Sequence, residues 1–136
     1  MAKLIDFSEA FLIAIHGVVV IAKNKMSNIK EVSALIGASE NHVSKVLQRL
    51  VKNNVLKSVR GPEGGYMLAR NPEDILLIDV YESVEGKLTS SDCPFAKTGC
   101  SFNKCVFGSA VKKAEETMSS YLTGNTVRDL LANKVM

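Results

Sequence analysis

The sequence of 136 residues has no cysteine outside one short stretch and no long hydrophobic run. Its one apolar stretch, residues 12–22, is interrupted by His16 and Gly17 and is too short to span a bilayer, so we expect a buried helix there. The N-terminus carries acids early and shows no signal-peptide pattern. Internal repeats and low-complexity tracts are also missing. These absences predict a modest folded protein of the reducing cytoplasm that has no membrane partner.

All three cysteines, Cys93, Cys100 and Cys105, fall within a polar, loop-like stretch. An odd number cannot be fully paired within one chain, which argues against a set of structural disulfides. Free structural cysteines usually lie singly in a core. Three on one polar loop are better explained as soft thiolate ligands that converge on a metal. We therefore predict a metal site at these three cysteines, with chance clustering as the alternative.

Positive charge is concentrated in one part of the chain. Residues 37–70 contain six basic and two acidic residues, a balance of +4 within a total of +3, so the remainder sums to −1. A basic segment within a nearly neutral chain suggests contact with a polyanion. On charge alone, an ordinary solvated face is an equal alternative.

The first half of the chain has the pattern of a helix-turn-helix. Apolar residues at helical spacing predict a first helix, with Asp6 as its N-cap and Glu9 as its capping-box acid. A short second helix begins after Asn28 and ends at Gly37. Ser39 then begins a third helix with one apolar stripe. The opposite face of that helix is polar and basic, and it carries Asn41, Lys45, Gln48, Arg49 and Lys52.

A hairpin is predicted directly after the third helix. Residues 55–60 and 66–69 have strand character, and the glycine-rich residues 61–65 form the turn between them. A hairpin in this position is a wing, although the turn alone would also suit an ordinary hairpin. We expect the third helix to enter the DNA major groove while Arg60 and the turn approach the backbone or minor groove.

Further helices are predicted on either side of the cysteine loop. Asn71 and the proline after it indicate a helix start, with the end at Gly86. Apolar spacing from Val106 predicts a long helix, and a short one follows Gly124. The fold class is therefore mainly α with a small β-hairpin wing. Residues 1–86 would be the DNA-binding domain, 87–105 the cysteine loop, and 106–136 a dimerisation helix and tail whose apolar face a second copy covers.

Residues 59–68, VRGPEGGYML, resemble the wing of the IscR/NsrR-type bacterial transcription regulators, and the resemblance covers essentially the whole chain. It implies a homodimer that binds a roughly palindromic operator in double-stranded DNA. It also implies that the cysteine loop holds an iron–sulphur cluster, [2Fe–2S] or [4Fe–4S], that gates DNA binding. The DNA-contacting positions that it implies are Asn41, Lys45, Arg60 and Gly61, with His42, Gln48 and Arg49 less firmly aligned.

The cysteine pattern departs from that of IscR. Six and then four residues separate the cysteines here, and Gly108 stands where IscR has a histidine ligand, so the IscR ligand set does not carry over. NsrR-like nitric oxide sensors can draw a carboxylate from the first helix of the other subunit, and Glu9 aligns there. Glu9 is thus either a fourth ligand from a partner subunit or only a capping-box acid.

The leading hypothesis is a repressor of transcription that senses nitric oxide, redox state or iron–sulphur status through its cluster. A zinc- or thiol-redox-based regulator of the same fold is the alternative. An iron–sulphur enzyme or electron carrier is the third hypothesis, but no constellation of substrate-site residues supports it. His16, within the apolar stretch, is expected to be a packed histidine rather than a catalytic base.

Overall fold

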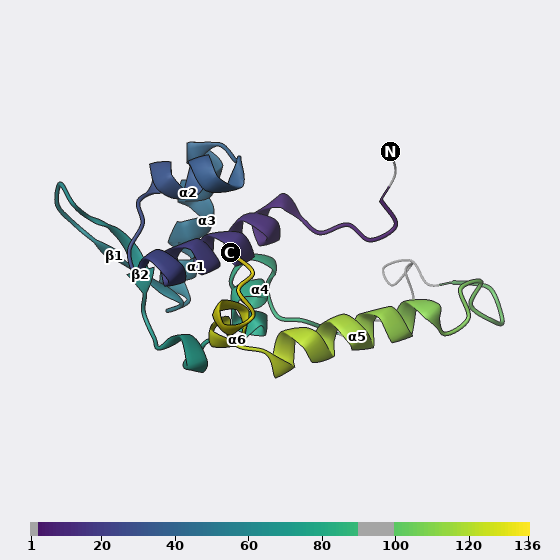
Figure 1. Cartoon of the computed structure of the whole chain (residues 1–136). Helices are drawn as coiled ribbons and strands as arrows, with labels where there is room; N and C mark the ends of the chain where they lie inside the picture. The colour runs from purple at the N-terminus through teal and green to yellow at the C-terminus, as the bar shows by residue number, and fades with distance from the viewer. Residues whose placement is uncertain (1–2, 90–99) are drawn as a thin grey trace.

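The computed structural model describes residues 3–89 and 100–136 of the chain. Within these residues it is mostly helical with one two-stranded sheet (Figure 1). The helices are α1 (Glu9–Asn24), α2 (Ile29–Ile36), α3 (Glu40–Lys52), α4 (Leu77–Glu85), α5 (Ala110–Gly124) and α6 (Val127–Ala132). The strands are β1 (Leu56–Val59) and β2 (Gly65–Leu68), and a 3₁₀ turn, η1, spans Pro72–Asp74.

Helix α1 lies at the centre of the fold and contacts α2, α3, α4 and α6. Its N-cap is Ser8, whose hydroxyl accepts a hydrogen bond from the N–H of Phe11 at 3.1 Å. The prediction that Asp6 caps this helix is therefore wrong, and so is the capping-box role of Glu9, which is the first helical residue. Ser8 displaces Asp6 because its extended backbone places the hydroxyl opposite a free N–H of the first turn.

The prediction that His16 is packed is also wrong, because its side chain is exposed on α1. The ring Nδ1 lies 2.7 Å from the carbonyl oxygen of Leu12, one turn earlier in the same helix. The apolar neighbours of His16 on either side in the sequence, from Ile13 to Ile21, point toward the core instead. A continuous apolar stretch on a helix still has one outward side, and His16 lies on it.

Helix α2 begins and ends where the sequence predicts, and α3 begins where it predicts. The Asn28 side chain accepts from the N–H of Glu31 at 2.9 Å, and Ser39 accepts from the N–H of His42 at 3.2 Å. Between the two helices, Gly37 adopts a left-handed φ of 72°. The turn packs Val32 of α2 against the buried stripe of α3, so the polar face of α3 is left outward.

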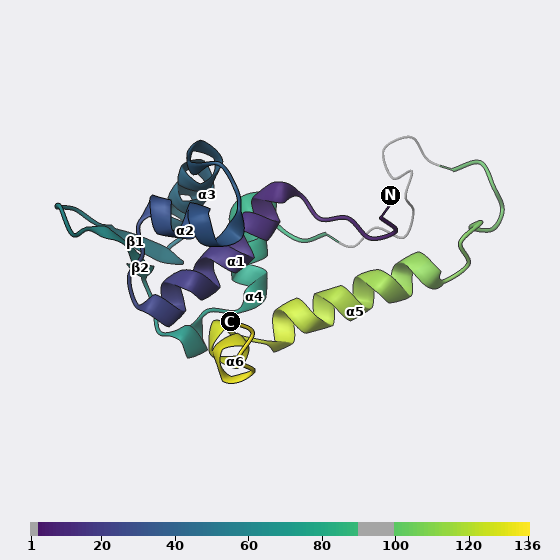
Figure 2. The same cartoon turned by 45° about the horizontal axis from the view of Figure 1, so that its top comes forward.

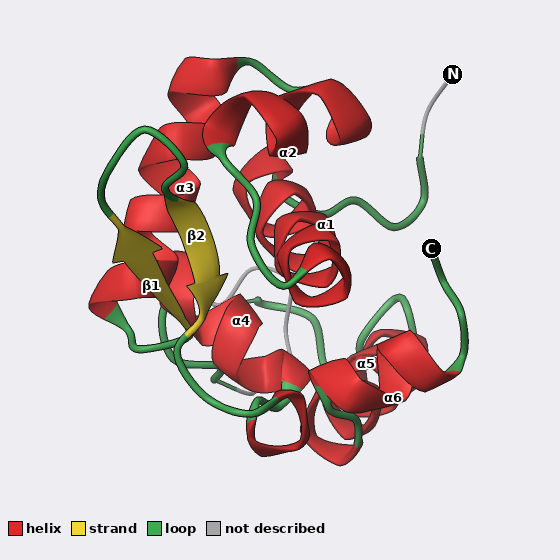
Figure 3. Ribbon diagram, turned by 60° about the vertical axis from the view of Figure 1, so that its left-hand side comes forward, coloured by secondary structure: helices red, strands yellow, loops and turns green. Residues whose placement is uncertain are grey.

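The hairpin that follows is antiparallel, with Leu56 paired with Leu68 and Val59 with Gly65 (Figure 3). It is fixed to the α1–α2 connection by two backbone hydrogen bonds between Ser27 and Tyr66, of 3.1 and 2.8 Å. Glycine is required at position 64 for a steric reason, because a Cβ there would lie 2.1 Å from the carbonyl oxygen of Val59.

The chain between the hairpin and α4 differs from the predicted continuous helix. Pro72 begins only the short η1, and residues 75–76 are extended. The carbonyl of Ile75 accepts from the N–H of Val127 at 2.9 Å, and the Leu77 N–H donates to the carbonyl of Asn125 at 3.0 Å. This backbone pairing with the α5–α6 connection competes with helix formation and delays the start of α4.

The long helix is confirmed, but it begins at Ala110 rather than near Val106, which is 72% exposed. Figures 1 and 2 both show α5 extending away from the rest of the molecule at its N-terminal end. At its other end Leu122 is buried, and α6 returns to pack against α1 and η1.

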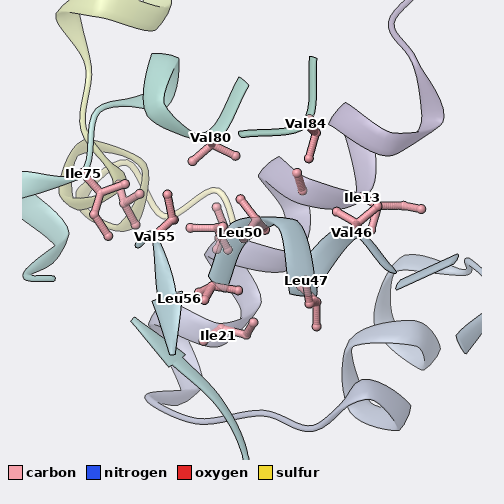
Figure 4. Packing of buried hydrophobic residues seen from close by; sticks show 14 of the residues in the cluster. Ile13, Ile21, Val46, Leu47, Leu50, Val55, Leu56, Ile75, Val80 and Val84 are labelled. Atoms are coloured by element: carbon pink, nitrogen blue, oxygen red, sulfur yellow. The ribbon is translucent and has the colours of Figure 1, made fainter. Parts of the chain in front are cut away.

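One hydrophobic core unites these elements (Figure 4). Leu47 and Leu50 from α3, Leu56 from β1 and Val80 from α4 are essentially inaccessible to solvent. Burying side chains of this size stabilises the fold by about 1.5–3 kcal/mol each. Across residues 3–89 and 100–136, no helix combines the length and apolar character needed to cross a bilayer.

Candidate functional site

The outer face of α3 is an exposed polar and basic surface beside the hairpin. Asn41, Lys45, Gln48 and Lys52 are exposed, while the opposite side of the helix is buried in the core. The Gln48 amide donates to the Ser44 hydroxyl at 3.2 Å, which keeps both side chains along the helix surface. A shallow hollow runs beside this face. It is lined by Ala10, His42, Lys45, Val46, Gln48, Arg49 and Lys52.

The hairpin supplies a second basic element next to α3, as Figure 3 shows. Arg60 and Gly61 lie where β1 enters the turn, and both are exposed. Gly61 has a φ of +114° with open space around it, and its carbonyl accepts from the N–H of Gly64 at 3.0 Å. Lys57 is exposed on β1. The structure thus places the predicted contact residues of α3 and the hairpin on two adjoining elements.

His42 and Glu9 are brought together, which the sequence did not predict. His42 Nδ1 lies 3.4 Å from Glu9 Oε1, and the two side chains are 35% and 68% exposed. Glu9 is on the first turn of α1 and His42 on the first turn of α3. The start of the basic helix is therefore linked to the start of α1.

Arg49 faces a different neighbour from the other polar residues of α3. Its guanidinium Nη1 donates to the carbonyl oxygen of Val84, in the last turn of α4, at 3.0 Å. Asn53, which follows α3, donates to the carbonyl of Arg49 at 2.8 Å and to that of Ser83 at 3.5 Å. No pattern of side chains signals such contacts, because their acceptors are backbone carbonyls that every residue possesses.

Of the three predicted cysteine ligands, Cys93 lies outside the described residues. Cys100 and Cys105 are exposed and carry free thiols. The backbone N–H of Phe107 donates to the Cys105 Sγ at 3.4 Å. Among residues 3–89 and 100–136, no group of three His, Cys, Asp or Glu side chains is placed to share a metal ion.

Comparison with known proteins identifies relatives over nearly the full chain. A family model described as "Rrf2: Iron-dependent Transcriptional regulator" matches residues 7–133. The HTH-type transcriptional regulator NsrR of Shouchella clausii is 30% identical over 118 residues, which cover 82% of this chain and 76% of that protein.

Solved structures share the fold. The structure titled "T. potens IscR" superposes with a TM-score of 0.70 at 25% identity, covering 96% of this chain and 89% of its own. CymR of Bacillus subtilis, titled a global cysteine regulator, superposes with a TM-score of 0.73 at 17% identity, covering 96% and 98%. The second likeness concerns the fold alone.

Proposed function

The chain belongs to the Rrf2 family of transcriptional regulators, and we propose that it is a repressor that senses nitric oxide, redox state or iron–sulphur supply through an iron–sulphur cluster. Proteins of this family regulate transcription and are not enzymes. The observation that carries the DNA-binding half of the proposal is the exposed basic face of α3 beside a basic hairpin.

In this proposal α3 is the recognition helix and the hairpin is the wing. Asn41 and Gln48 have amide groups suited to reading base edges in the major groove, and Lys45 has a charge suited to phosphate. Arg60 approaches the backbone or minor groove from the wing, where Gly61 leaves room for close approach. His42 lies at the edge of this surface, on the side where Glu9 binds it. A Lys45→Ala substitution should weaken binding to all DNA sequences in a salt-dependent manner.

The cysteine segment has the donor chemistry that an iron–sulphur cluster requires. Cys93, Cys100 and Cys105 would hold it, and the N–H of Phe107 that binds the Cys105 sulphur would help to set its potential. A bound cluster with only three protein thiolates supplies one less firmly held iron, where nitric oxide, oxygen or a reductant can react. Because Glu9 has no capping role and is exposed, Glu9 of the partner subunit is our candidate for the fourth ligand.

We also propose that two copies assemble through α5. Tyr121 is 48% exposed, Val111, Met118 and Ser119 are half-buried, and the rest of the helix except Leu122 is exposed. A helix with so little cover in one chain gains stability when a second copy packs against it. Two recognition helices related by a two-fold axis would then read the two halves of a roughly palindromic operator.

The decisive experiment is iron and sulphide analysis with a visible absorption spectrum, on protein purified from the cytoplasm of the expressing cells without oxygen. We expect a coloured protein containing both elements. Cys100→Ala should lose the colour and change the affinity for DNA. Ser101→Ala, at the neighbouring exposed residue, is the matched control and should keep both. Full colour in the Cys100→Ala protein would contradict the cluster assignment.

The second candidate is a zinc- or thiol-based regulator of the same fold. It is favoured by the exposure of the Cys100 and Cys105 thiols, which are accessible to oxidants and to zinc. A colourless protein with one zinc per chain, or with reversible thiol oxidation that alters DNA binding, would establish this candidate in place of the cluster.

A further inference from the structure

The last turn of α4 is held by side chains from two other helices. Arg49, in the last turn of the recognition helix, donates to the carbonyl of Val84, and Asn53, the residue that follows this helix, donates to that of Ser83. From the other side, the hydroxyl of Ser8 at the start of α1 donates to the carboxylate of Glu85. The final carbonyls of a helix have no partner within the helix, so side chains that reach them fix its end in place.

The chain leaving α4 is tied back to the same turn. Gly86 has a φ of 85°, and its N–H donates to the carbonyl of Glu82 at 3.1 Å. The N–H of Leu88 then donates to the Glu82 carboxylate at 2.8 Å. The direction in which the chain departs toward the cysteine segment is therefore fixed to the last turn of α4.

Apolar packing lies beneath these polar contacts. Val84 of α4 is 8% exposed, and it belongs to the same buried cluster as Val46 and Leu50 of α3 (Figure 4). Close-packed interiors transmit displacement rather than absorb it. A movement of the last turn of α4 would thus be carried to the recognition helix through the packed side chains and the hydrogen bonds above them.

We propose that Arg49 and Asn53 are positioning residues that connect the recognition helix to the end of α4, so that the state of the cysteine segment sets the orientation of α3 on DNA. This inference rests on the proposed function, which supplies the two states of the cysteine segment, with and without a bound cluster. The planar guanidinium of Arg49 suits the role because it remains charged and holds a fixed donor geometry. The inference competes with the sequence prediction that Arg49 contacts DNA directly.

The first test distinguishes positioning from DNA contact by salt dependence. The probe is a duplex selected by the wild-type protein from random-sequence DNA. Neutralising one side chain that binds a phosphate should reduce the slope of log affinity against log salt concentration by about 0.9. We expect this reduction for Lys45→Gln and no reduction for Arg49→Gln, with Lys113→Gln on α5 as the control for removal of one charge. A reduction of about 0.9 for Arg49→Gln would overturn the inference.

The second test measures coupling between the cysteine segment and DNA. The same duplex is titrated with protein purified without oxygen and with protein stripped of metal by a chelator. The quantity compared is the ratio of the two affinities for the duplex. Allosteric couplings typically change affinity about 5–150-fold, and we expect the ratio for the wild type to lie in this range. In Arg49→Gln/Asn53→Ala the ratio should fall to about one. Arg49→Lys keeps the charge but lacks the planar fork, so it should lose most of the ratio while its salt slope stays that of the wild type. An unchanged ratio in both variants would overturn the inference.

A third measurement requires no DNA and separates this inference from the proposed function. Amide hydrogen exchange in α3 is compared between the two protein states. We expect the exchange rates in α3 to differ between the two states in the wild type and to be equal in the Arg49→Gln/Asn53→Ala variant. If the double variant retains the full difference, the inference fails even where DNA binding is intact. If no DNA binds in either state, the proposed function fails, and the exchange result alone decides for or against the inference.

Discussion

The half of the molecule from α1 to α4, which carries the proposed DNA-binding surface, and the half that follows α4 differ in how completely one chain buries their apolar side chains. From α1 to α4 the core is continuous, and α3 alone buries Val43, Val46, Leu47 and Leu50. In α5 the single buried residue is Leu122, and the residues before it include Phe107, which is 53% exposed. The first half supplies most of the core, which Leu122, Val127 and Leu130 complete, whereas α5 offers surfaces that a cofactor or a second chain would have to cover.

The comparison predicts that the two halves respond differently to the loss of an apolar side chain. The largest effect is expected for Leu47→Ala, because Leu47 is 0% exposed and its truncation leaves a cavity in the core. We expect a decrease of about 2–5 kcal/mol in the free energy of unfolding, measured by chemical denaturation at fixed protein concentration. Leu35→Ala on α2, where the side chain is 58% exposed, is the matched control and should cost less than about 0.5 kcal/mol. Equal costs would contradict the burial assigned to α3.

A substitution on α5 should affect association rather than folding. Tyr121 is 48% exposed in one chain, and aromatic residues at the centre of an interface often contribute about 2 kcal/mol or more. We expect Tyr121→Glu to weaken dimer formation by roughly thirtyfold, measured by sedimentation equilibrium. The unfolding free energy extrapolated to the monomer should change little. If Tyr121→Glu leaves the dimer intact, α5 does not form the interface as proposed.

The hairpin and α5 also differ in the space that is available for a side chain at their glycines. A Cβ on Gly64 would lie 2.1 Å from the carbonyl of Val59, while at Gly124 nothing lies within 4 Å. We expect Gly64→Ala to cost about 1–3 kcal/mol and to loosen the hairpin, as measured by unfolding and by amide exchange in β1. Gly124→Ala should be neutral or stabilising by about 0.4–1 kcal/mol, because it restricts the unfolded chain. A neutral Gly64→Ala would show that the turn adopts another conformation.

Local signals in the sequence were sufficient to predict much of the structure from α2 to the hairpin. The caps at Asn28 and Ser39 and the left-handed Gly37 depend on side chains within a few residues, so their positions could be predicted. The start of α4 could not be predicted, because the backbone of Ile75 pairs with Val127, more than fifty residues later. Serine and aspartate are nearly equal as N-cap residues, so the sequence could not decide whether Ser8 or Asp6 caps α1.

In the candidate site too, features set by nearby residues could be predicted and features set by distant residues could not. The polar face of α3 could be predicted because it is the complement of a buried stripe with helical spacing. The contact between Arg49 and Val84 could not, since it depends on where α4 ends relative to α3 and uses a backbone acceptor. The approach of Glu9 to His42 depends equally on how two distant helices cross. The convergence of Cys93 with the other two cysteines remains a prediction.

The smallest expected effect on stability comes from the N-caps of α3 and α5, which differ between the two halves. At the start of α3 the hydroxyl of Ser39 accepts from the N–H of His42, whereas Ser109 at the start of α5 makes no side-chain capping hydrogen bond. Removing a serine N-cap typically costs about 1 kcal/mol, so Ser39→Ala should lower the unfolding free energy by about that amount. Ser109→Ala is the matched control and should stay within about 0.5 kcal/mol of the wild type. Thermal and chemical unfolding of both variants measure the difference. A cost for Ser109→Ala equal to that for Ser39→Ala would mean that the start of α5 is capped in the assembled protein, and that the second half is completed by contacts that one chain does not contain.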